Sequence, residues 1–335
     1  MSTFDASSEQ SLSIIGCGNM GTAILNGLLQ AQAAPAQSDS TATPLPKSFI
    51  ATVRSTTSHA KLTKRFAPYL SSSSNNTSQC PQVTILQGPT ANSEAIRNST
   101  TILLCIDPAD ISSFFADVSI RAALRGKFVI SIAAGWTRDA LFGSLSPEIQ
   151  DLQIVRALPN MAASVGQSIT AIEVPPPPKR GLDGTGVDAI PNPTDSHIAF
   201  VQAIFSAIGR TLLIPPSQMT AFTAVGGSTP AFVAVFADAL IEGAVAMGFP
   251  RADAQTTIFQ ALRGATALMQ DGGLHPAMLR DQGTSPGGCT MGGLMVLEER
   301  GLRGTVARGM REAVSVAGLM GKQNEDEEGF VNGTR

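Results

Sequence analysis

The stretch Ile14-Ile15-Gly16-Cys17-Gly18-Asn19-Met20-Gly21 lies near the start of the chain, between a short apolar run and a segment with helical periodicity. Its glycines follow the spacing G-x-G-x-x-G, which between a strand and a helix is typical of a dinucleotide-binding loop. In such a loop Gly16 permits a tight turn, Gly18 lets the backbone approach a pyrophosphate, and Gly21 lets the helix pack on the strand. The alternative is a glycine turn with a structural role only. We predict that six consecutive residues contact a dinucleotide: Gly16, Cys17, Gly18, Asn19, Met20 and Gly21.

Short apolar runs alternate with helical patterns through the first half of the chain. Such near-continuous apolar runs are typical of a parallel sheet covered on both faces, and the alternation predicts a doubly wound, Rossmann-like α/β domain. The expected strands are 12–15, 49–53, 83–86, 101–106, 128–132, 154–157 and 211–214, and the expected helices are 20–31, 58–66, 93–98, 110–123 and 198–208.

After Pro215 the periodicity is helical almost throughout, which predicts an all-α second domain. The expected helices there are 217–225, 229–247, 251–269, 276–281, 291–299 and 302–319. We predict a Rossmann-type domain over 1–214 with inserts at 33–47, 71–81 and 174–194, a helical dimerisation and substrate domain over 215–322, and a polar tail over 323–335.

Composition narrows the classes of protein further. Of the 335 residues 43% are hydrophobic and only 15% are charged, against about 25% charged on average, so disorder is excluded and we expect self-association. A net charge of −3 argues against nucleic-acid binding. The most apolar span, Pro230 to Phe249, is interrupted by Asp238 and Glu242, and no signal peptide is evident, so we expect a cytoplasmic protein without a membrane partner. The four cysteines form no CxxC pair, and no metal site is expected.

The residues that end the second expected strand bear on the choice between NAD and NADP. An NAD-binding domain carries a carboxylate there for the ribose 2′-hydroxyl. This chain has Ala51-Thr52-Val53-Arg54-Ser55-Thr56, without an acid. A guanidinium can hold a 2′-phosphate with two parallel hydrogen bonds. We therefore predict NADPH, with NADH possible, bound through Arg54 and Ser55; the alternative is a solvated arginine.

Two further loops follow expected strands at the edge of the sheet where ligands bind in open α/β folds. The first is Cys105-Ile106-Asp107-Pro108, and the second contains Ala133-Ala134-Gly135. Small residues there let a cofactor approach the backbone, although an ordinary turn is an equal alternative for the second loop. The predicted cofactor contacts are Ile106, Asp107, Pro108, Ala133, Ala134 and Gly135.

The run Ser285-Pro286-Gly287-Gly288-Cys289-Thr290 precedes an expected helix and predicts a second anion site. Backbone N–H groups at a helix start form a small anion-binding concavity, and without a lysine the site suits a carboxylate rather than a triphosphate. The alternative is a plain helix cap made by Ser285 or Thr290. For His275, a helix start and a catalytic role both stay open.

Together these motifs resemble those of the pyrroline-5-carboxylate reductase family. The resemblance rests on the Gly16–Gly21 loop, Ala133-Ala134-Gly135, Arg156-Ala157-Leu158-Pro159-Asn160-Met161, Gly226-Gly227-Ser228-Thr229-Pro230-Ala231-Phe232, His275-Pro276 and Arg280–Thr290. It implies a Rossmann domain followed by a helical domain that intertwines with a second subunit, and a homodimer or larger oligomer. It also adds Asn160 to the cofactor contacts.

The resemblance implies that the chain reduces 1-pyrroline-5-carboxylate, a cyclic imine carboxylate, to L-proline with NAD(P)H. Ser285, Gly287, Gly288, Cys289 and Thr290 would bind the substrate, with the Thr290 hydroxyl as the catalytic group near the ring nitrogen. Proximity and orientation would then supply most of the catalysis.

This sequence departs from the family pattern at two informative positions. Asp107-Pro108 stands where the family usually has Lys-Pro, and Phe232 stands where it usually has tyrosine. These changes leave two alternatives open: a related reductase acting on another cyclic imine acid, and a non-catalytic NADP-binding sensor. A β-hydroxyacid dehydrogenase is disfavoured because the chain has no lysine between Lys179 and Lys322.

Overall fold

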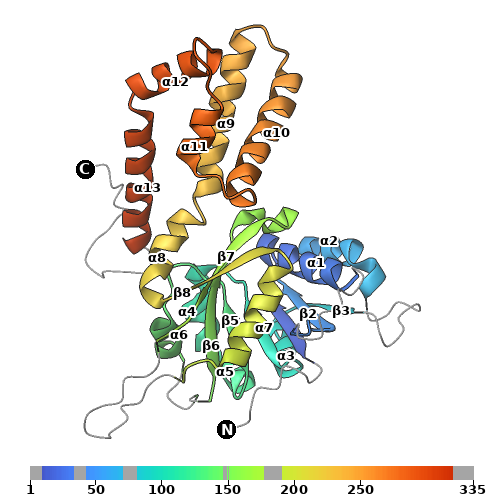
Figure 1. Cartoon of the computed structure of the whole chain (residues 1–335). Helices are drawn as coiled ribbons and strands as arrows, with labels where there is room; N and C mark the ends of the chain where they lie inside the picture. Colours follow the sequence, from blue (N-terminus) through green and yellow to red (C-terminus); the bar gives the residue numbers. More distant parts are fainter. Residues whose placement is uncertain are drawn as a thin grey trace, which may run out of the picture. The chain divides into compact units, whose positions relative to one another are not determined.

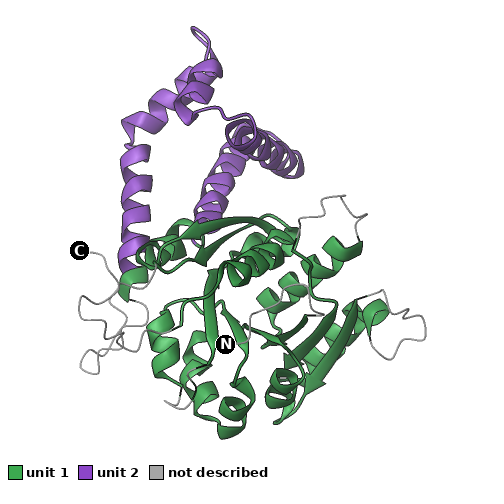
Figure 2. Ribbon diagram, turned by 60° about the horizontal axis from the view of Figure 1, so that its bottom comes forward, with its two compact units in different colours: residues 1–227, 317–330 green, residues 228–316, 331–335 purple. Residues whose placement is uncertain are grey.

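The computed structural model of the chain describes residues 10–33, 43–70, 81–145, 149, 151–176 and 191–319. It forms two compact units, coloured separately in Figure 2. Unit 1 contains Met1–Gly227 and Ala317–Phe330, and unit 2 contains Ser228–Val316 and Val331–Arg335. The predicted inserts and the polar tail lie largely outside the described residues.

Unit 1 is built on an eight-stranded sheet in the order β3-β2-β1-β4-β5-β6-β7-β8 (Figure 1). All neighbouring strands are parallel except β6 and β7. This confirms the Rossmann-like doubly wound fold. The strands are β1 (Ser11–Ile15), β2 (Ser48–Val53), β3 (Gln82–Gln87), β4 (Thr101–Leu104), β5 (Phe128–Ser131), β6 (Gln153–Leu158), β7 (Ser168–Glu173) and β8 (Gly209–Ile214).

A hydrophobic core covers each face of this sheet. On one face the apolar sides of α1 and α7 pack on the strands through residues such as Leu25 and Phe200. On the other face α3, α4, α5 and α6 supply residues such as Ile96, Phe115 and Leu141. The helices of unit 1 are α1 (Asn19–Ala33), α2 (Thr56–Arg65), α3 (Ala91–Arg97), α4 (Ile111–Ala116), α5 (Val118–Leu124), α6 (Arg138–Gly143), α7 (Asp195–Ser206) and α8 (Pro216–Val225), with short 3-10 turns η1 (Ala67–Tyr69), η2 (Pro108–Asp110) and η3 (Met161–Val165).

Unit 1 differs from the sequence prediction in several features, among them helix α6, which was not predicted. The helix expected over 110–123 is broken at Asp117, whose backbone is extended and whose carboxylate accepts a hydrogen bond from the Ser119 N–H at 2.7 Å. Strand β7 was not predicted. It pairs antiparallel to β6, and this places the buried Glu173 carboxylate 2.6 Å from the Arg156 guanidinium.

The compact units divide after Gly227, and the domain boundary at 214/215 stays a prediction. Helix α8 belongs to unit 1 because Met219 and Phe222 are buried against Leu158, Ala171 and Ile214. The chain then crosses into unit 2 directly after Gly227.

Unit 2 is helical, as predicted, and has a sparse core of its own. Its helices are α9 (Thr229–Ala246), α10 (Arg251–Gln270), α11 (Pro276–Gln282), α12 (Cys289–Glu299) and α13 (Leu302–Leu319), the last of which ends in unit 1. Among the described residues of this unit the buried hydrophobic side chains are Ala237, Ile241 and Ala254. Large apolar side chains are exposed instead, among them Val233, Val235, Phe249, Phe259, Met295 and Val296.

One described stretch, Pro216–Ala246, is long and apolar enough to cross a membrane by length and composition alone. It comprises α8 and α9, and only 22% of its most apolar window is buried within the chain. It also carries Asp238 and Glu242. An apolar helix whose side chains are largely exposed in one chain is typical of an interface helix.

Candidate functional site

The three glycines of the phosphate loop occupy the positions that their spacing predicts. Gly16 has φ +80°, and a Cβ there would lie 2.8 Å from Ile106 Cγ2. A Cβ at Gly21 would lie 2.9 Å from Ile14 Cγ2, so the glycine lets α1 pack on β1. A Cβ at Gly18 would meet nothing within 4 Å. The open space at Gly18 is where a pyrophosphate can approach the backbone, so this loop fits a dinucleotide.

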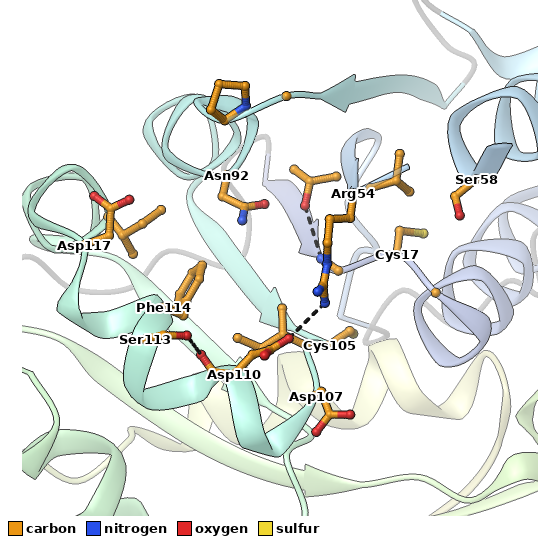
Figure 3. A pocket seen from close by; sticks show the side chains of 18 residues that line it. Cys17, Arg54, Ser58, Asn92, Cys105, Asp107, Asp110, Ser113, Phe114 and Asp117 are labelled. Carbon is orange, nitrogen blue, oxygen red and sulfur yellow. Dashed lines mark hydrogen bonds and ion pairs between the residues drawn. The ribbon is translucent and has the colours of Figure 1, made fainter. Parts of the chain in front are cut away.

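A cavity of about 560 Å³ opens beside this loop, at the carboxyl ends of β1, β2 and β4 (Figure 3). It is lined by six of the predicted cofactor contacts, namely Gly16, Cys17, Gly18, Arg54, Ile106 and Asp107. Residues that the sequence analysis did not single out also line it, among them Ser58, Asn92, Asp110, Phe114 and Asp117. The site therefore draws on α2, α3, α4 and the start of α5 as well as on the strand ends.

A second, larger hollow of about 1030 Å³ lies on the other side of the loop, between α1, α2 and η3. It brings together Asn19 and Met20 from the start of α1 with Met161 and Ser164 from η3. Lys61, Lys64 and Arg65 of α2 give this hollow a basic rim. Both cavities share Cys17 and Gly18, so the loop lies between them.

Arg54 lies at the mouth of the first cavity and forms an ion pair. Its Nη2 is 2.9 Å from Asp110 Oδ2, and the two side chains are 89% and 44% exposed. An exposed pair of this kind is weak, so the guanidinium is available to a stronger anion. Figure 3 shows Arg54 pointing across the cavity toward Asp110.

Ser55 does not line either cavity. It is the N-cap of α2, where its hydroxyl accepts a hydrogen bond from the Ser58 N–H at 3.2 Å and donates one to the Ser58 hydroxyl at 3.0 Å. Ser58 lines both cavities. The sequence analysis missed Ser58, although the Ser-x-x-Ser spacing at a helix start marks the pair.

Three carboxylates line the first cavity opposite Arg54. Asp107 caps η2 and accepts a hydrogen bond from the Ala109 N–H at 2.9 Å. Asp110 pairs with Arg54. Asp117 caps α5, and hydrogen bonds from Ser119 lower the pKa of its carboxyl. Asp107 and Asp117 thus serve as helix caps. Their capping bonds explain why these two carboxylates lie on one side of the cavity.

The two thiols beneath the loop are protonated. Burial raises the pKa of Cys17 to about 11, and burial followed by the neighbouring Cys17 raises the pKa of Cys105 well above its usual range. A thiol is nucleophilic only as the thiolate. Both side chains therefore act as small apolar groups in the cavity wall.

The loop after β5 is placed beside the loop after β4 but lines neither cavity. Ala133 is buried in the core and Gly135 has φ +80°. The Trp136 Nε1 donates a hydrogen bond to the Pro108 carbonyl at 2.9 Å, which joins the two loops. The predicted contacts Pro108, Ala133, Ala134 and Gly135 line neither cavity, and their cofactor contacts stay a prediction.

Asn160 has other partners than the predicted cofactor. Its Oδ1 accepts a hydrogen bond from the Ala162 N–H at 3.2 Å, and its Nδ2 donates to the Gly226 carbonyl at 2.9 Å. The residue is 8% exposed and lines neither cavity.

The predicted anion site in unit 2 has the expected backbone. Ser285 to Gly288 form a tight turn closed by a hydrogen bond from the Gly288 N–H to the Ser285 carbonyl at 2.9 Å, with Gly287 at φ +71°. Proline before a left-handed glycine is typical of a type II turn. Helix α12 then begins at Cys289, and the N-cap residue Gly288 makes no side-chain capping bond. Gly288 has no side chain with which to cap the first turn of α12, and the choice between an anion site and a plain cap made by Ser285 or Thr290 stays open.

His275 is the N-cap of α11. Its Nδ1 accepts a hydrogen bond from the Ala277 N–H at 3.2 Å, and Pro276 occupies the first turn. The helix-start interpretation of this residue accounts for its position.

Comparisons with known proteins match both parts of the chain. A family model described as pyrroline-5-carboxylate reductase dimerisation matches residues 216–320, and one described as NADP oxidoreductase, coenzyme F420-dependent, matches residues 11–135. A pyrroline-5-carboxylate reductase of Lophium arboricola is 40% identical over 100% of this chain and 99% of its own length. One of Neurospora crassa is 37% identical over 98% of each.

Solved structures share the fold. A pyrroline-5-carboxylate reductase from Coxiella burnetii superposes with a TM-score of 0.70 at 22% identity, covering 94% of this chain and 100% of that one. The Plasmodium falciparum pyrroline carboxylate reductase with NADP bound gives 0.66 at 22% identity, covering 93% and 98%.

Proposed function

This chain belongs to the pyrroline-5-carboxylate reductase family, and from that premise we propose that it reduces 1-pyrroline-5-carboxylate to L-proline with NADPH. As a member it is an oxidoreductase acting on C=N and CH–NH bonds with NAD(P)H, it self-associates through its helical domain, and it takes part in proline biosynthesis. By the same membership it is a soluble enzyme; we propose the cytoplasm as its compartment.

Unit 1 fits the dinucleotide that this reaction requires. The open Gly18 backbone suits the pyrophosphate, and the first cavity offers Arg54 for the 2′-phosphate. When bound, the reduced nicotinamide supplies the hydride. The chain contributes binding and orientation, with the thiols of Cys17 and Cys105 as protonated, apolar wall groups. NADH would lose the Arg54 interaction and keep the rest.

The turn at Ser285–Thr290 is the observation that carries the substrate assignment. Its glycine N-cap and the start of α12 present backbone N–H groups and a positive helix end, which suit one carboxylate. We assign the substrate carboxylate to the N–H groups of Gly288, Cys289 and Thr290, beside Ser285 and Gly287. A carboxylate held there places the adjoining imine ring within reach of the Thr290 hydroxyl, which we assign as the group that hydrogen-bonds the ring nitrogen.

The reaction requires few further groups from the protein. The imine carbon accepts the hydride and the ring nitrogen carries one proton, so a C=N bond becomes a CH–NH bond. Thr290 orients the nitrogen, and solvent supplies the proton before or during the reaction. Holding the reactants in this geometry supplies most of the rate enhancement.

The test follows the absorbance of NADPH with pyrroline-5-carboxylate and, in parallel, with a six-membered cyclic imine acid. We expect oxidation with the five-membered substrate and formation of proline. No oxidation with either imine would refute the reductase assignment.

A second candidate is a reductase of the same family that prefers another cyclic imine. Asp107 and Phe232 motivate it, because both depart from the family pattern. Asp107 lines the cofactor cavity as a helix cap, so that change acts on the cofactor side. Phe232 lies on α9 with 36% of its surface exposed, and it alone favours an altered substrate. A higher kcat/KM for the six-membered ring in the same assay would select this candidate.

A further inference from the structure

The carbonyl of Gly226 is left without a donor from its own helix. In a continuous helix the carbonyl of residue 226 accepts from the N–H of residue 230. Residue 230 is proline, which has no N–H and whose ring crowds that same carbonyl. The backbone between α8 and α9 stays in the helical region, with Gly226 at φ −85°, ψ −39° and Ser228 at φ −89°, ψ −23°. Residues 226–228 form a turn between α8 and α9, and the Gly226 N–H still donates to the Phe222 carbonyl at 2.8 Å.

Asn160 supplies the missing donor from another element. Its Nδ2 lies 2.9 Å from the Gly226 carbonyl oxygen in a buried bond. These two partners fix the orientation of the Asn160 amide. Exchanging its nitrogen and oxygen would lose the bond to Gly226 and also the bond that Oδ1 accepts from the Ala162 N–H. The Asn160 backbone N–H in turn donates to Ser168 Oγ at 3.1 Å, which ties this residue to β7.

The Asn160–Gly226 bond lies beside both the nucleotide site and the end of unit 1. The chain leaves unit 1 directly after Gly227. Asn160 precedes η3, whose Met161 and Ser164 line the hollow beside the phosphate loop. A single side chain therefore links the wall of the nucleotide site to the point where the chain departs for the helical unit.

We propose that Asn160 is a positioning residue, which orders the backbone where the chain leaves unit 1 by holding the Gly226 carbonyl that Pro230 leaves free. The inference rests on the proposed function, because unit 2 carries the Ser285–Thr290 turn. Hydride transfer requires the two reactants to meet, and a displacement near 1 Å costs about 100-fold in rate. Asn160 thus acts on the reaction through the order of the backbone at 226–229, without touching either reactant.

The test compares Asn160→Ser with the double variant Asn160→Ser/Pro230→Ala. Serine keeps the N-cap acceptor for Ala162 but is too short to reach Gly226. We expect kcat to fall about 10- to 100-fold, the NADPH Kd to change less than about twofold, and amide hydrogen exchange at 226–232 to quicken. In the double variant the Pro230→Ala change restores a backbone N–H that can donate to the Gly226 carbonyl. We expect the Tm of this variant to recover while kcat stays low, because its own helix, and no longer Asn160, then holds the Gly226 carbonyl.

Asn192→Ser is the matched control. Asn192 also donates its Nδ2 to a backbone carbonyl, that of Pro176 at 3.0 Å, far along the chain from the exit, and its loss should leave kcat and exchange at 226–232 unchanged. Pro230→Ala alone is a second variant, and it does not create a cavity in the core. In this variant kcat should fall without a fall in Tm.

Three results would overturn the proposal. These are an unchanged kcat in Asn160→Ser, an NADPH Kd that rises in step with the loss of kcat, and a double variant in which kcat recovers together with Tm. The first would show that the bond has no role in catalysis. The second would return Asn160 to the cofactor contacts, and the third would reduce it to a structural residue. A wild-type enzyme without imine-dependent NADPH oxidation would instead refute the proposed function, while the exchange measurement would still report on the Asn160 bond.

Discussion

Arg54 should select NADPH over NADH, and the structure sets the size of the effect. When NADPH binds, the guanidinium must exchange Asp110 for the 2′-phosphate. The Arg54–Asp110 pair is 89% and 44% exposed, so its loss costs about 0–1 kcal/mol. A charge-assisted hydrogen bond to the phosphate contributes about 1.5–3 kcal/mol. The net gain of about 1–2 kcal/mol corresponds to about 5- to 30-fold in Kd.

The perturbation is Arg54→Ala, measured by titrating the fluorescence of NADPH and of NADH at fixed ionic strength. We expect the NADPH Kd to rise about 5- to 30-fold and the NADH Kd to stay nearly constant, because NADH lacks the phosphate. Asp110→Asn should act in the opposite direction. It frees Arg54 and removes a like charge from the phosphate, so NADPH should bind up to about fivefold more tightly.

The control is Arg303→Ala, which removes another exposed ion pair, 2.7 Å long with Glu298, outside both cavities. It should alter neither Kd. Equal weakening of NADPH and NADH by Arg54→Ala, or weaker NADPH binding in Asp110→Asn, would contradict the reasoning.

Three further predictions concern the helical unit and the sheet. Thr290→Ala should lower kcat/KM for the imine about 10- to 100-fold with the NADPH Kd retained, as read by steady-state kinetics and titration; unchanged turnover would remove Thr290 from the site. Val235 on α9 is 73% exposed in the single chain, so Val235→Glu should shift the mass in light scattering toward the monomer and lower activity, whereas an unchanged oligomer would place the interface elsewhere. Burial lowers the pKa of His197 from 6.5 to about 4, so the folded state binds fewer protons than the unfolded state between those values; stability should be full above pH 6.5 and fall by about 2 kcal/mol at pH 5. Urea unfolding of His197→Asn should lack that loss, and a parallel fall in both proteins would assign it to other groups.

The fold was predictable from the sequence because most of its strands and helices carry a recognisable pattern within a short run of neighbouring residues. Each parallel strand is a short apolar run such as 101–104, and each helix of unit 2 repeats an apolar period. The glycine loop carries its own spacing, so the roles of Gly16, Gly18 and Gly21 followed from sequence alone. The turn before α12 followed likewise from the run Pro286-Gly287-Gly288.

The features that sequence did not predict depend on pairing between distant segments. Arg54 and Asp110 are 56 residues apart, and nothing in either neighbourhood indicates the other. Strand β7 was missed because its sequence, Ser168-Ile169-Thr170-Ala171-Ile172-Glu173, is short and alternates only in part, although a turn ending at the left-handed Gly166 precedes it. Glu173 finds Arg156 only through the antiparallel register of β6 and β7. The family resemblance added Asn160 to the predicted cofactor contacts, but only the structure shows that its amide donates to a carbonyl 66 residues later.

Unit 2 buries few side chains of its own, so its folding should depend on association with a second copy and therefore on protein concentration. Unit 1 has a core on each face of its sheet, whereas the helices after Gly227 bury few apolar side chains without a second copy. The free energy that orders them then depends on protomer concentration. On dilution the helical region should melt at a progressively lower temperature while the nucleotide domain melts at a constant one. A calorimetric scan would thus resolve into a concentration-dependent and a concentration-independent transition, and a dilute cell extract would lose reductase activity before it lost the ability to bind NADPH.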